Sequence, residues 1–449
     1  MAMCNPDRAA LGTVAGRKVL ADFSGGHVTS DAGVLLLSLV EAKVRLLERA
    51  AALIPDPRNP LKVEHTQEAT LRQRVFALAL GYEDVIDHDE LCKDIAFQTA
   101  AGRVEKLAGA STVARLEHRA DKKSLWELHK LLLEAFFESH AVAPEEIILD
   151  LDSTDFRVHG GQEGRHFSAF YDENIFLPLY VFCGRHLLVS YLRPGRSDNM
   201  KHVRAIMRLL VAEIEKRWPR TKVVVRGDSG FYRHDFLTWM ERNRIAYLIG
   251  FSQNPALNNH AKHIAEKSKI LHKKSGDKAR VVDSLFYHAR SWTLPDTTKR
   301  GYRRKPIVRK LVVRAETGTL GTDLRYVVTN IKGASRDIYD AYCCRGEMEN
   351  RIKDTKCHLF ACRTSSIHWL ANQFRVMLAS LAYTLLENLR REALQGTDLA
   401  TAEVTTVRLR LLKIGAVVIR NTRRIFFKMA DGYPFKDLYY AALARLQPA

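Results

Sequence analysis

The stretch EEIILDLDST, residues 145–154, marks the point at which predicted helices give way to predicted strands. It follows Pro144, is rich in Ile and Leu as a buried strand requires, and carries two aspartates, Asp150 and Asp152. Two further predicted strands, IFLPLYVFC (175–183) and HLLVSYLRPG (186–195), are separated only by a short turn at Gly184. Such a short connection predicts an antiparallel hairpin.

The next segments alternate between helical and strand patterns. They are a helix at 200–218, the strand TKVVVRGDSG at 221–230, a helix at 234–243, and strands at 246–252 and 324–331. Antiparallel strands followed by alternating helices and strands predict an α/β fold with a mixed sheet. The last two strands are far apart in the chain, which predicts an insertion between them.

Helical patterns dominate the residues before Pro144. Apolar residues recur at helical spacing in 30–54, 66–80 and 121–140, and Pro55 and Gly81 are placed to end the first two helices. A chain of 449 residues is long enough for about three domains. We expect a mainly helical N-terminal domain, a mixed-sheet core in two pieces, a basic insertion and a C-terminal segment, with bounds 1–143, 144–252 and 325–395, 253–324, and 396–449.

The charge of the chain favours a polyanionic partner. The formal net charge is +19 and the pI is about 9.6. Residues 253–324 contain 16 Lys or Arg and 6 Asp or Glu, so this segment carries +10 of that charge. Basic residues interleaved with aromatic ones favour nucleic acid, although cations also protect the exposed edge of a β-hairpin. The candidate DNA contacts in this segment are Arg303, Arg304, Lys305 and Trp292, and the alternative for Trp292 is a core position.

A second group of candidate residues lies near GEMENRIKDTK, residues 346–356. If the chain from Tyr342 to Lys356 were one α-helix, Arg345, Glu349 and Lys356 would lie at about 300°, 340° and 320° from Tyr342. These residues would form one narrow stripe. A stripe of one aromatic residue, two cations and one carboxylate does not resemble a core face, so we expect it to meet an anionic partner, a metal or both.

Three carboxylates on separate elements are candidate metal ligands. Asp152 lies in one predicted strand, Asp228 lies just past the end of another, and Glu349 lies on the predicted helix. Ligands usually bind at the carboxyl ends of strands in open α/β sheets. Three converging carboxylates would repel one another unless a divalent cation joined them. Asp150 is the alternative to Asp152, because residues two apart in a strand face the same way.

The spacing of Tyr342, Arg345, Glu349 and Lys356 resembles the signature of DDE transposases of the insertion-sequence-four superfamily. Asp152 with Ser153 and Thr154 resembles the first motif of that superfamily, and RGDSGF around Asp228 resembles the second. Other segments resemble the thirteen-eighty group of bacterial insertion sequences, namely GGHVTSDAGVLLL, LRQRVFALALGYEDVIDHDEL, STDFRVHGGQEG and PLYVFCG.

This resemblance implies a ribonuclease-H-like mixed-sheet core with a β-rich insertion between the second and third motifs. It implies that Asp152, Asp228 and Glu349 hold Mg²⁺, for which Mn²⁺ can substitute, and that Tyr342, Arg345 and Lys356 contact DNA phosphates. The implied reaction is cleavage at the ends of an insertion sequence and joining of the 3′ hydroxyls to target DNA, by a homodimer on double-stranded DNA. A non-catalytic DNA-binding protein and a structure-specific nuclease are the alternatives.

Cysteine usage and hydropathy favour a cytoplasmic protein, and the resemblance implies a bacterial one that associates with the nucleoid when bound to DNA. The seven cysteines include no CxxC pair, which favours reduced thiols over a zinc site. No apolar run reaches the length of a membrane span, and the N-terminus has no apolar signal core. We therefore expect no membrane association.

Overall fold

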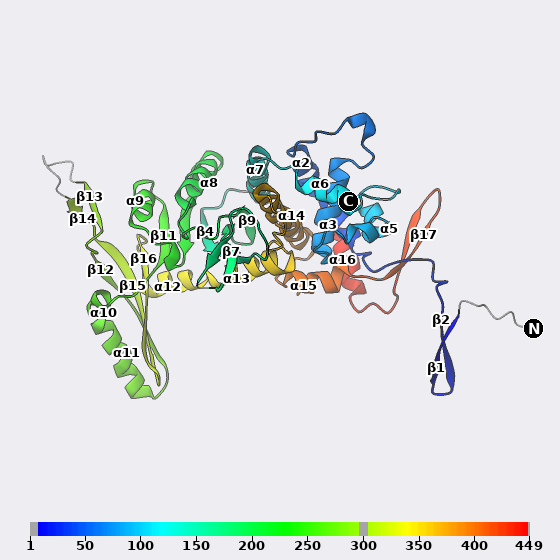
Figure 1. Ribbon diagram of the computed structural model, residues 1–449. Coiled ribbons are helices and arrows are strands. Elements are labelled where there is room, and N and C mark those ends of the chain that lie inside the picture. Colours follow the sequence, from blue (N-terminus) through cyan, green and yellow to red (C-terminus); the bar gives the residue numbers. More distant parts are fainter. Residues whose placement is uncertain (1–7, 170, 296–303, 448–449) are drawn as a thin grey trace, which may run out of the picture. The chain divides into compact units, whose positions relative to one another are not determined.

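The computed structural model describes residues 8–169, 171–295 and 304–447, which form two compact units (Figure 1). The helical unit consists of the residues up to Ser124, Cys357–Phe360 and the residues from Leu381 onward. The sheet unit consists of Leu125–Lys356 and Ala361–Ser380. The chain thus forms two units where four segments were expected, and the C-terminal residues belong to the same unit as the N-terminal ones.

The helical unit contains mostly short helices and two small sheets. Its strand β1 (Ala9–Val14) pairs with β2 (Arg17–Ala21), and β3 (His27–Thr29) pairs with β17 (Ala416–Arg420), which pairs with β18 (Ile425–Met429). The sequence patterns did not predict these strands. The helices are α1 (Val34–Val44), α2 (Leu46–Ala52), α3 (Gln67–Leu80), α4 (His88–Leu91), α5 (Ile95–Ala100), α6 (Ala110–Glu117), α15 (Val404–Val407) and α16 (Lys436–Leu446).

Local signals explain where these helices begin and end. The Thr66 hydroxyl accepts the Ala69 N–H at 3.2 Å and begins α3, and Gly81, with φ of 96°, ends it. These bounds confirm the helix predicted at 66–80. The helix predicted at 30–54 is instead two helices, because Arg45 adopts a left-handed conformation with φ of 50°.

The sheet unit is built on one eight-stranded mixed sheet. Strand β10 is parallel to its two neighbours β4 and β11, and every other neighbouring pair is antiparallel. The mixed α/β fold and the hairpin at Gly184 are therefore confirmed. The strand order is β12 (Ala279–Tyr287), β15 (Arg309–Gly318), β16 (Gly321–Thr329), β11 (Ala246–Phe251), β10 (Lys222–Gly227), β4 (Glu146–Ser153), β8 (Leu179–Cys183) and β9 (His186–Tyr191).

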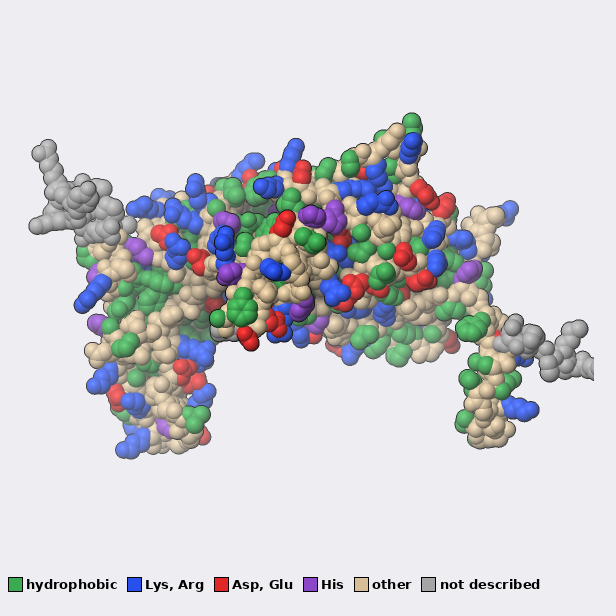
Figure 2. Space-filling view, in the orientation of Figure 1, with side chains coloured by type: hydrophobic (Ala, Val, Ile, Leu, Met, Phe, Trp, Pro, Cys, Tyr) green, Lys and Arg blue, Asp and Glu red, His purple; other side chains and the backbone are tan. Residues whose placement is uncertain are grey.

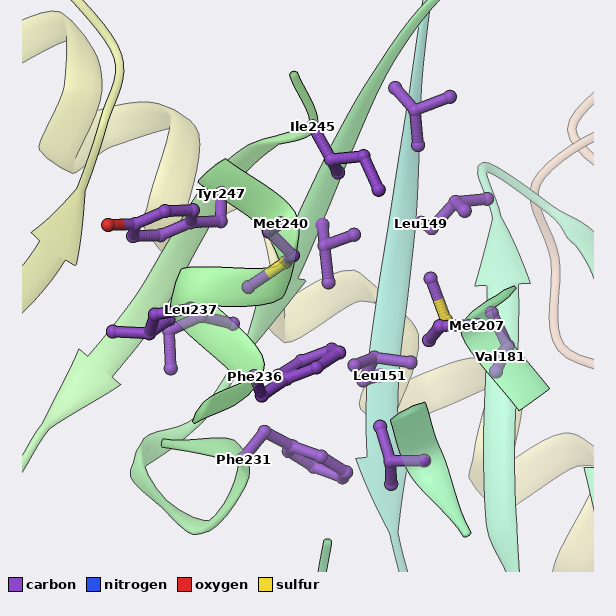
Figure 3. Close-up of a cluster of buried hydrophobic side chains, with 14 of the residues drawn as sticks. Leu149, Leu151, Val181, Met207, Phe231, Phe236, Leu237, Met240, Ile245 and Tyr247 are labelled. Carbon is purple, nitrogen blue, oxygen red and sulfur yellow. The ribbon is translucent and has the colours of Figure 1, made fainter. Parts of the chain in front are cut away.

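Helices cover both faces of this sheet. On one face, Leu149 and Leu151 of β4 pack with residues of α7 (Lys122–Glu138), α8 (Val203–Arg217) and α9 (His234–Arg242), and Figure 3 shows them beside Met207 and Phe236. On the other face, apolar residues of β10, β11, β15 and β16 pack with α12 (Ser335–Cys343). Because strand residues alternate between faces, Asp150 and Asp152 belong to the α12 face.

The basic segment 253–324 contains helices as well as the strands that were expected. It begins with two helices, α10 (Pro255–His260) and α11 (Lys262–Ser275), because apolar residues recur at helical spacing there. Its long strands β12 and β15 pair over nine positions and continue the central sheet. Only β13 (Thr293–Pro295) and β14 (Arg304–Pro306) form a separate two-stranded ribbon.

The segment from Tyr342 to Lys356 is not one continuous α-helix, contrary to the prediction. Helix α12 ends at Cys343, α13 runs from Gly346 to Lys353, and the π-helical turn η3 spans Asp354–His358. A π-turn closes its hydrogen bonds over one residue more than an α-turn, so the angular spacing assumed for Lys356 does not hold. The next helix, α14 (Trp369–Ala393), contributes residues to both units.

A small three-stranded sheet follows β4 in the chain. It consists of β5 (Phe156–Arg157), β7 (Glu173–Phe176) and β6 (His166–Ser168), paired in that order. Among the helices that the structure describes, none combines the length and the apolar character needed to cross a bilayer.

Candidate active site

Two aspartates lie at the carboxyl ends of neighbouring parallel strands. Leu151 of β4 pairs with Gly227 of β10, so the next residues, Asp152 and Asp228, are at the same edge of the sheet. Asp228 begins the short 3₁₀ helix η2 (Ser229–Phe231), and its Oδ1 accepts the Gly230 N–H at 2.9 Å. The structure therefore brings these two predicted residues together, as the strand pattern indicated.

Asp150, the alternative to Asp152, is fully engaged in a buried ion pair. Its side chain is 1% exposed, and its two carboxylate oxygens accept hydrogen bonds from Arg226, with Nη2 at 2.8 Å from Oδ2. Arg226 also donates to the Ala341 carbonyl of α12. Asp150 thus holds the arginine that attaches α12 to the sheet, and Asp152 is the carboxylate left at the strand end.

Arg345 connects Asp152 to Glu349. Its Nη1 lies 3.1 Å from Oδ2 of Asp152, and its Nη2 lies 3.1 Å from Oε1 of Glu349. The Asp152 side chain is 15% exposed, whereas that of Glu349 is 62% exposed. One guanidinium therefore joins two of the three predicted carboxylates, and Glu349 lies toward the solvent.

The three carboxylates influence one another electrostatically. Burial raises the pKa of Asp152 to about 6, the charge of Arg345 opposes this rise, and the charges of Asp228 and Glu349 add to it. Negative charge is thus concentrated where the two strands end. Arg345 compensates part of it.

Tyr342 lies against the strand ends. A Cβ atom placed on Gly250 of β11 would lie 2.7 Å from the Tyr342 hydroxyl and 3.0 Å from the backbone carbonyl carbon of Asp228. Only glycine leaves room for this approach. Burial raises the pKa of the Tyr342 hydroxyl, so this hydroxyl is neutral and can donate a hydrogen bond.

Lys356 approaches the same edge from the π-helical turn. Its Nζ lies 3.0 Å from Oδ1 of Asp155 and 3.1 Å from Oγ1 of Thr154. Thr154 and Asp155 lie two and three residues after Asp152 in the chain, and Asp155 was not singled out from the sequence. The sequence could have indicated Asp155 as a site residue, since it is a further carboxylate only three residues after Asp152.

The donor chemistry of this site suits a hard divalent cation, which prefers carboxylate oxygens. Within residues 8–169, 171–295 and 304–447, however, no three His, Cys, Asp or Glu side chains lie close enough together to hold a metal ion. The guanidinium of Arg345 lies between two of the candidate ligands, Asp152 and Glu349. The residues fit a divalent cation in type and charge.

A family model described as "Transposase DDE domain group 1" matches residues 11–449. The chain belongs to this transposase family. Membership implies an enzyme that cleaves and joins DNA.

No curated protein matches the chain. Among solved structures, it is similar to a chain of "piggyBac transposase synaptic complex with hairpin DNA", with a TM-score of 0.41 and 11% identity over 86% of this chain and 80% of that chain. The family assignment rests on the match of the family model to the sequence.

The structure of the transposase corrects the expectation that Trp292 is available to stack on a base. Trp292 is 0% exposed, and its ring packs among Tyr232, Phe251 and Tyr287. Its Nε1 donates a hydrogen bond to the Tyr232 hydroxyl, and Arg309 lies 5.0 Å from the centre of its ring. In this position Trp292 is a core residue.

The other predicted DNA contacts of the basic segment are only partly described. Arg303 lies outside the described residues, Arg304 is described by its backbone in β14, and Lys305 is exposed in the same strand. Figure 2 shows Lys and Arg side chains on the arm that contains α11, together with Asp and Glu. Several of these cations are paired, for example Lys267 with Asp283 at 3.2 Å.

Proposed function

We propose that this transposase cleaves DNA at the ends of its own insertion sequence and joins the freed 3′ hydroxyls to target DNA. The single observation that carries this proposal is the arrangement of Asp152 and Asp228 at adjacent parallel strand ends, with Glu349 connected to Asp152 through Arg345. It rests also on membership of the transposase family.

In this proposal, Asp152, Asp228 and Glu349 hold divalent cations, and Mg²⁺ is the one we propose, with Mn²⁺ as a substitute. Bound there, such ions stabilise negative charge on the attacking and leaving oxygens of a phosphodiester. The attacking group is water in cleavage and a 3′ hydroxyl in joining. The three carboxylates fix where this charge stabilisation acts.

Arg345, Lys356 and Tyr342 are the proposed phosphate contacts. The two cations are held by carboxylates, Arg345 by Asp152 and Glu349, and Lys356 by Asp155. A DNA phosphate is a comparable anionic acceptor for a guanidinium or an ammonium group. We propose that Arg345 exchanges a carboxylate for a phosphate when DNA binds, which leaves that carboxylate free for a cation.

We further propose a ribonuclease-H-like core and membership of the insertion-sequence-four superfamily, thirteen-eighty group. Three antiparallel strands, β4, β8 and β9, beside two strands parallel to β4 support the first assignment. The spacing of Tyr342, Arg345, Glu349 and Lys356 supports the second. Because both ends of an element must be cut, we propose that two copies of the chain act together.

The test uses the full chain, linear DNA that carries the inverted repeats flanking the coding region, and a circular target. In Mg²⁺ the proposal predicts 3′-hydroxyl ends at the repeats and their joining to the circle, and in excess chelator it predicts neither. Cleavage without joining would favour a structure-specific nuclease. Binding without cleavage would favour a non-catalytic DNA-binding protein.

A further inference from the structure

Arg193 is a buried arginine that bonds to residues adjoining Asp152 and Asp228. It follows β9 in the chain, its side chain is 0% exposed, and its guanidinium donates to backbone carbonyls and to one hydroxyl. The acceptors are Leu177 O at 2.8 Å from Nε, Asn199 O at 2.8 Å, Lys201 O at 3.1 Å and Asp198 O at 3.5 Å from Nη1, and Ser153 Oγ at 2.6 Å from Nη2.

The hydrogen bond from Arg193 to Ser153 links Arg193 indirectly to Asp152. Ser153 directly follows Asp152, and its N–H donates to Oδ1 of Asp152 at 2.8 Å. The backbone of Ser153 thus holds the carboxylate while its hydroxyl is held by Arg193. A shift of the Arg193 side chain would therefore move the residue that orients Asp152.

The hydrogen bond from Arg193 to the Asn199 carbonyl links Arg193 indirectly to Asp228. A Cβ atom placed on Gly230 would lie 2.2 Å from Nδ2 of Asn199 and 3.1 Å from Oδ1 of Asp228. The Asn199 side chain is therefore packed against the turn in which the Gly230 N–H holds Asp228. Arg193 fixes the backbone of Asn199, and so fixes the side chain that limits this turn.

Burial of the charged Arg193 side chain needs an explanation beyond packing. Taking a charged guanidinium out of water is unfavourable, and burial lowers the pKa of Arg193 to about 10. An apolar side chain of similar size would avoid that cost. Several donors in a fixed planar geometry can, however, join three separate segments at once, which an apolar side chain cannot do.

We propose that Arg193 is a positioning residue that sets the distance between Asp152 and Asp228, and through it the ability of these carboxylates to share a divalent cation. This inference rests on the proposed function of the two aspartates. Arg193 is fully buried, and its hydrogen bonds go to neither carboxylate. It acts through Ser153 on one side and Asn199 on the other.

The test compares Arg193→Lys with Arg309→Lys in the full chain. Arg309 is a matched control, because it is 3% exposed and each of its guanidinium nitrogens also has a partner, among Glu241, Thr238 and His234. We expect similar losses of thermal stability from the two variants. Only Arg193→Lys should weaken Mn²⁺ binding, measured by isothermal titration, and lower kcat for end cleavage. We expect each effect to be about 10- to 100-fold, as is typical when a residue that orients a metal ligand is changed.

DNA binding separates this role from a general structural one. With Arg345 and Lys356 intact, Arg193→Lys should bind end DNA in Ca²⁺ as Arg309→Lys does, so that kcat falls while KM for DNA is unchanged. Ser153→Ala removes only the hydroxyl acceptor and should weaken Mn²⁺ binding in the same direction by a smaller factor. It keeps the inference testable if Arg193→Lys does not fold.

Equal Mn²⁺ affinity in Arg193→Lys and Arg309→Lys would overturn the inference, as would wild-type affinity in Ser153→Ala if Arg193→Lys does not fold. A wild-type chain that binds Mn²⁺ but never cleaves would instead contradict the proposed function. The metal titration would still decide the role of Arg193 in that case.

Discussion

Arg345 and Asp152 form an ion pair, with Nη1 at 3.1 Å from Oδ2, although 192 residues lie between them in the chain. The same guanidinium pairs with Glu349. Two residues that we assign to metal binding thus share one positive charge, that of a residue that we assign to phosphate binding. In DNA-free protein, Arg345 and a divalent cation would compete for the same carboxylates.

Arg345→Gln should therefore strengthen divalent-ion binding in the absence of DNA and weaken binding of end DNA. We expect about a tenfold gain in Mn²⁺ affinity, equivalent to about 1.4 kcal/mol, because the carboxylates lose their compensating charge. Isothermal titration measures the first effect and a gel shift in Ca²⁺ measures the second. Arg351→Gln is the control, since Arg351 pairs with Glu347 on the same helix at 2.7 Å. Unchanged Mn²⁺ affinity in Arg345→Gln would mean that the two cations do not compete.

Trp292→Ala should act on stability. Removal of a fully buried tryptophan typically costs about 3–5 kcal/mol of unfolding free energy, which denaturant titration can measure. Trp126→Ala is the control, because Trp126 is 44% exposed and should lose much less. At a temperature where Trp292→Ala is folded, double-strand cleavage should proceed normally. Nicked DNA that accumulates without any loss of stability would show that the ring leaves the core and acts on DNA.

His88 should make the folded state sensitive to acid. It is 0% exposed, its Nδ1 lies 2.9 Å from Nε2 of Gln73, and burial lowers its pKa from 6.5 to about 3. Above pH 6.5 the residue is neutral in both folded and unfolded chains and contributes nothing to the pH dependence. Between pH 6.5 and about 3 only the unfolded chain takes up the proton, so the unfolding free energy should fall by about 1.4 kcal/mol per pH unit.

Denaturant titration of wild type and His88→Gln from pH 7 to about 4 measures this contribution. The variant should show a shallower decline with acidification. His263→Gln, which changes an exposed histidine, should keep the wild-type decline. If the unfolding free energy of wild type and of His88→Gln fell equally with acidification, His88 would be excluded as the source of the acid sensitivity.

The basic ribbon should contribute to the salt dependence of DNA binding. Replacing Arg303, Arg304 and Lys305 with Ala should reduce the slope of log affinity against log salt by roughly one for each lost phosphate contact. The matched control replaces Arg208, Lys216 and Arg217, three exposed cations of α8. Fluorescence anisotropy at several salt concentrations gives both slopes. Equal slopes for the two triple variants would assign the effect to net charge alone.

The fold was predictable where local signals agree with the tertiary structure. Thr66 and Gly81 are capping residues, so the sequence predicts α3 closely. The mixed sheet followed from apolar strand runs separated by helices. The extension of the sheet by β12 and β15 was not predictable, because pairing between strands over nine positions leaves no local signal. The break near Arg345 also lacks a Pro or Gly before it, since Gly346 is already the first residue of α13.

The site was predictable in its residue types and less so in its contacts. Strand ends placed Asp152 and Asp228 correctly at one edge. The roles of Asp150 and Asp152 are distinguished by the ion pair of Asp150 with Arg226, which lies 76 residues away in the chain. Arg193 has no sequence signal, because its acceptors are mainly backbone carbonyls, which every residue possesses.

Glu349→Gln tests the central claim that these carboxylates perform DNA cleavage and joining. The variant keeps the shape of the side chain and removes its charge, and Glu347→Gln is the control, since Glu347 is an exposed acid on the same helix. Complexes with end DNA are formed in Ca²⁺, quantified by gel shift, and then transferred to Mg²⁺. We predict that Glu349→Gln binds end DNA at least as tightly as wild type and does not cleave it, while Glu347→Gln cleaves normally. Cleavage by Glu349→Gln at the wild-type rate would contradict the account and leave α13 as a DNA-binding element only.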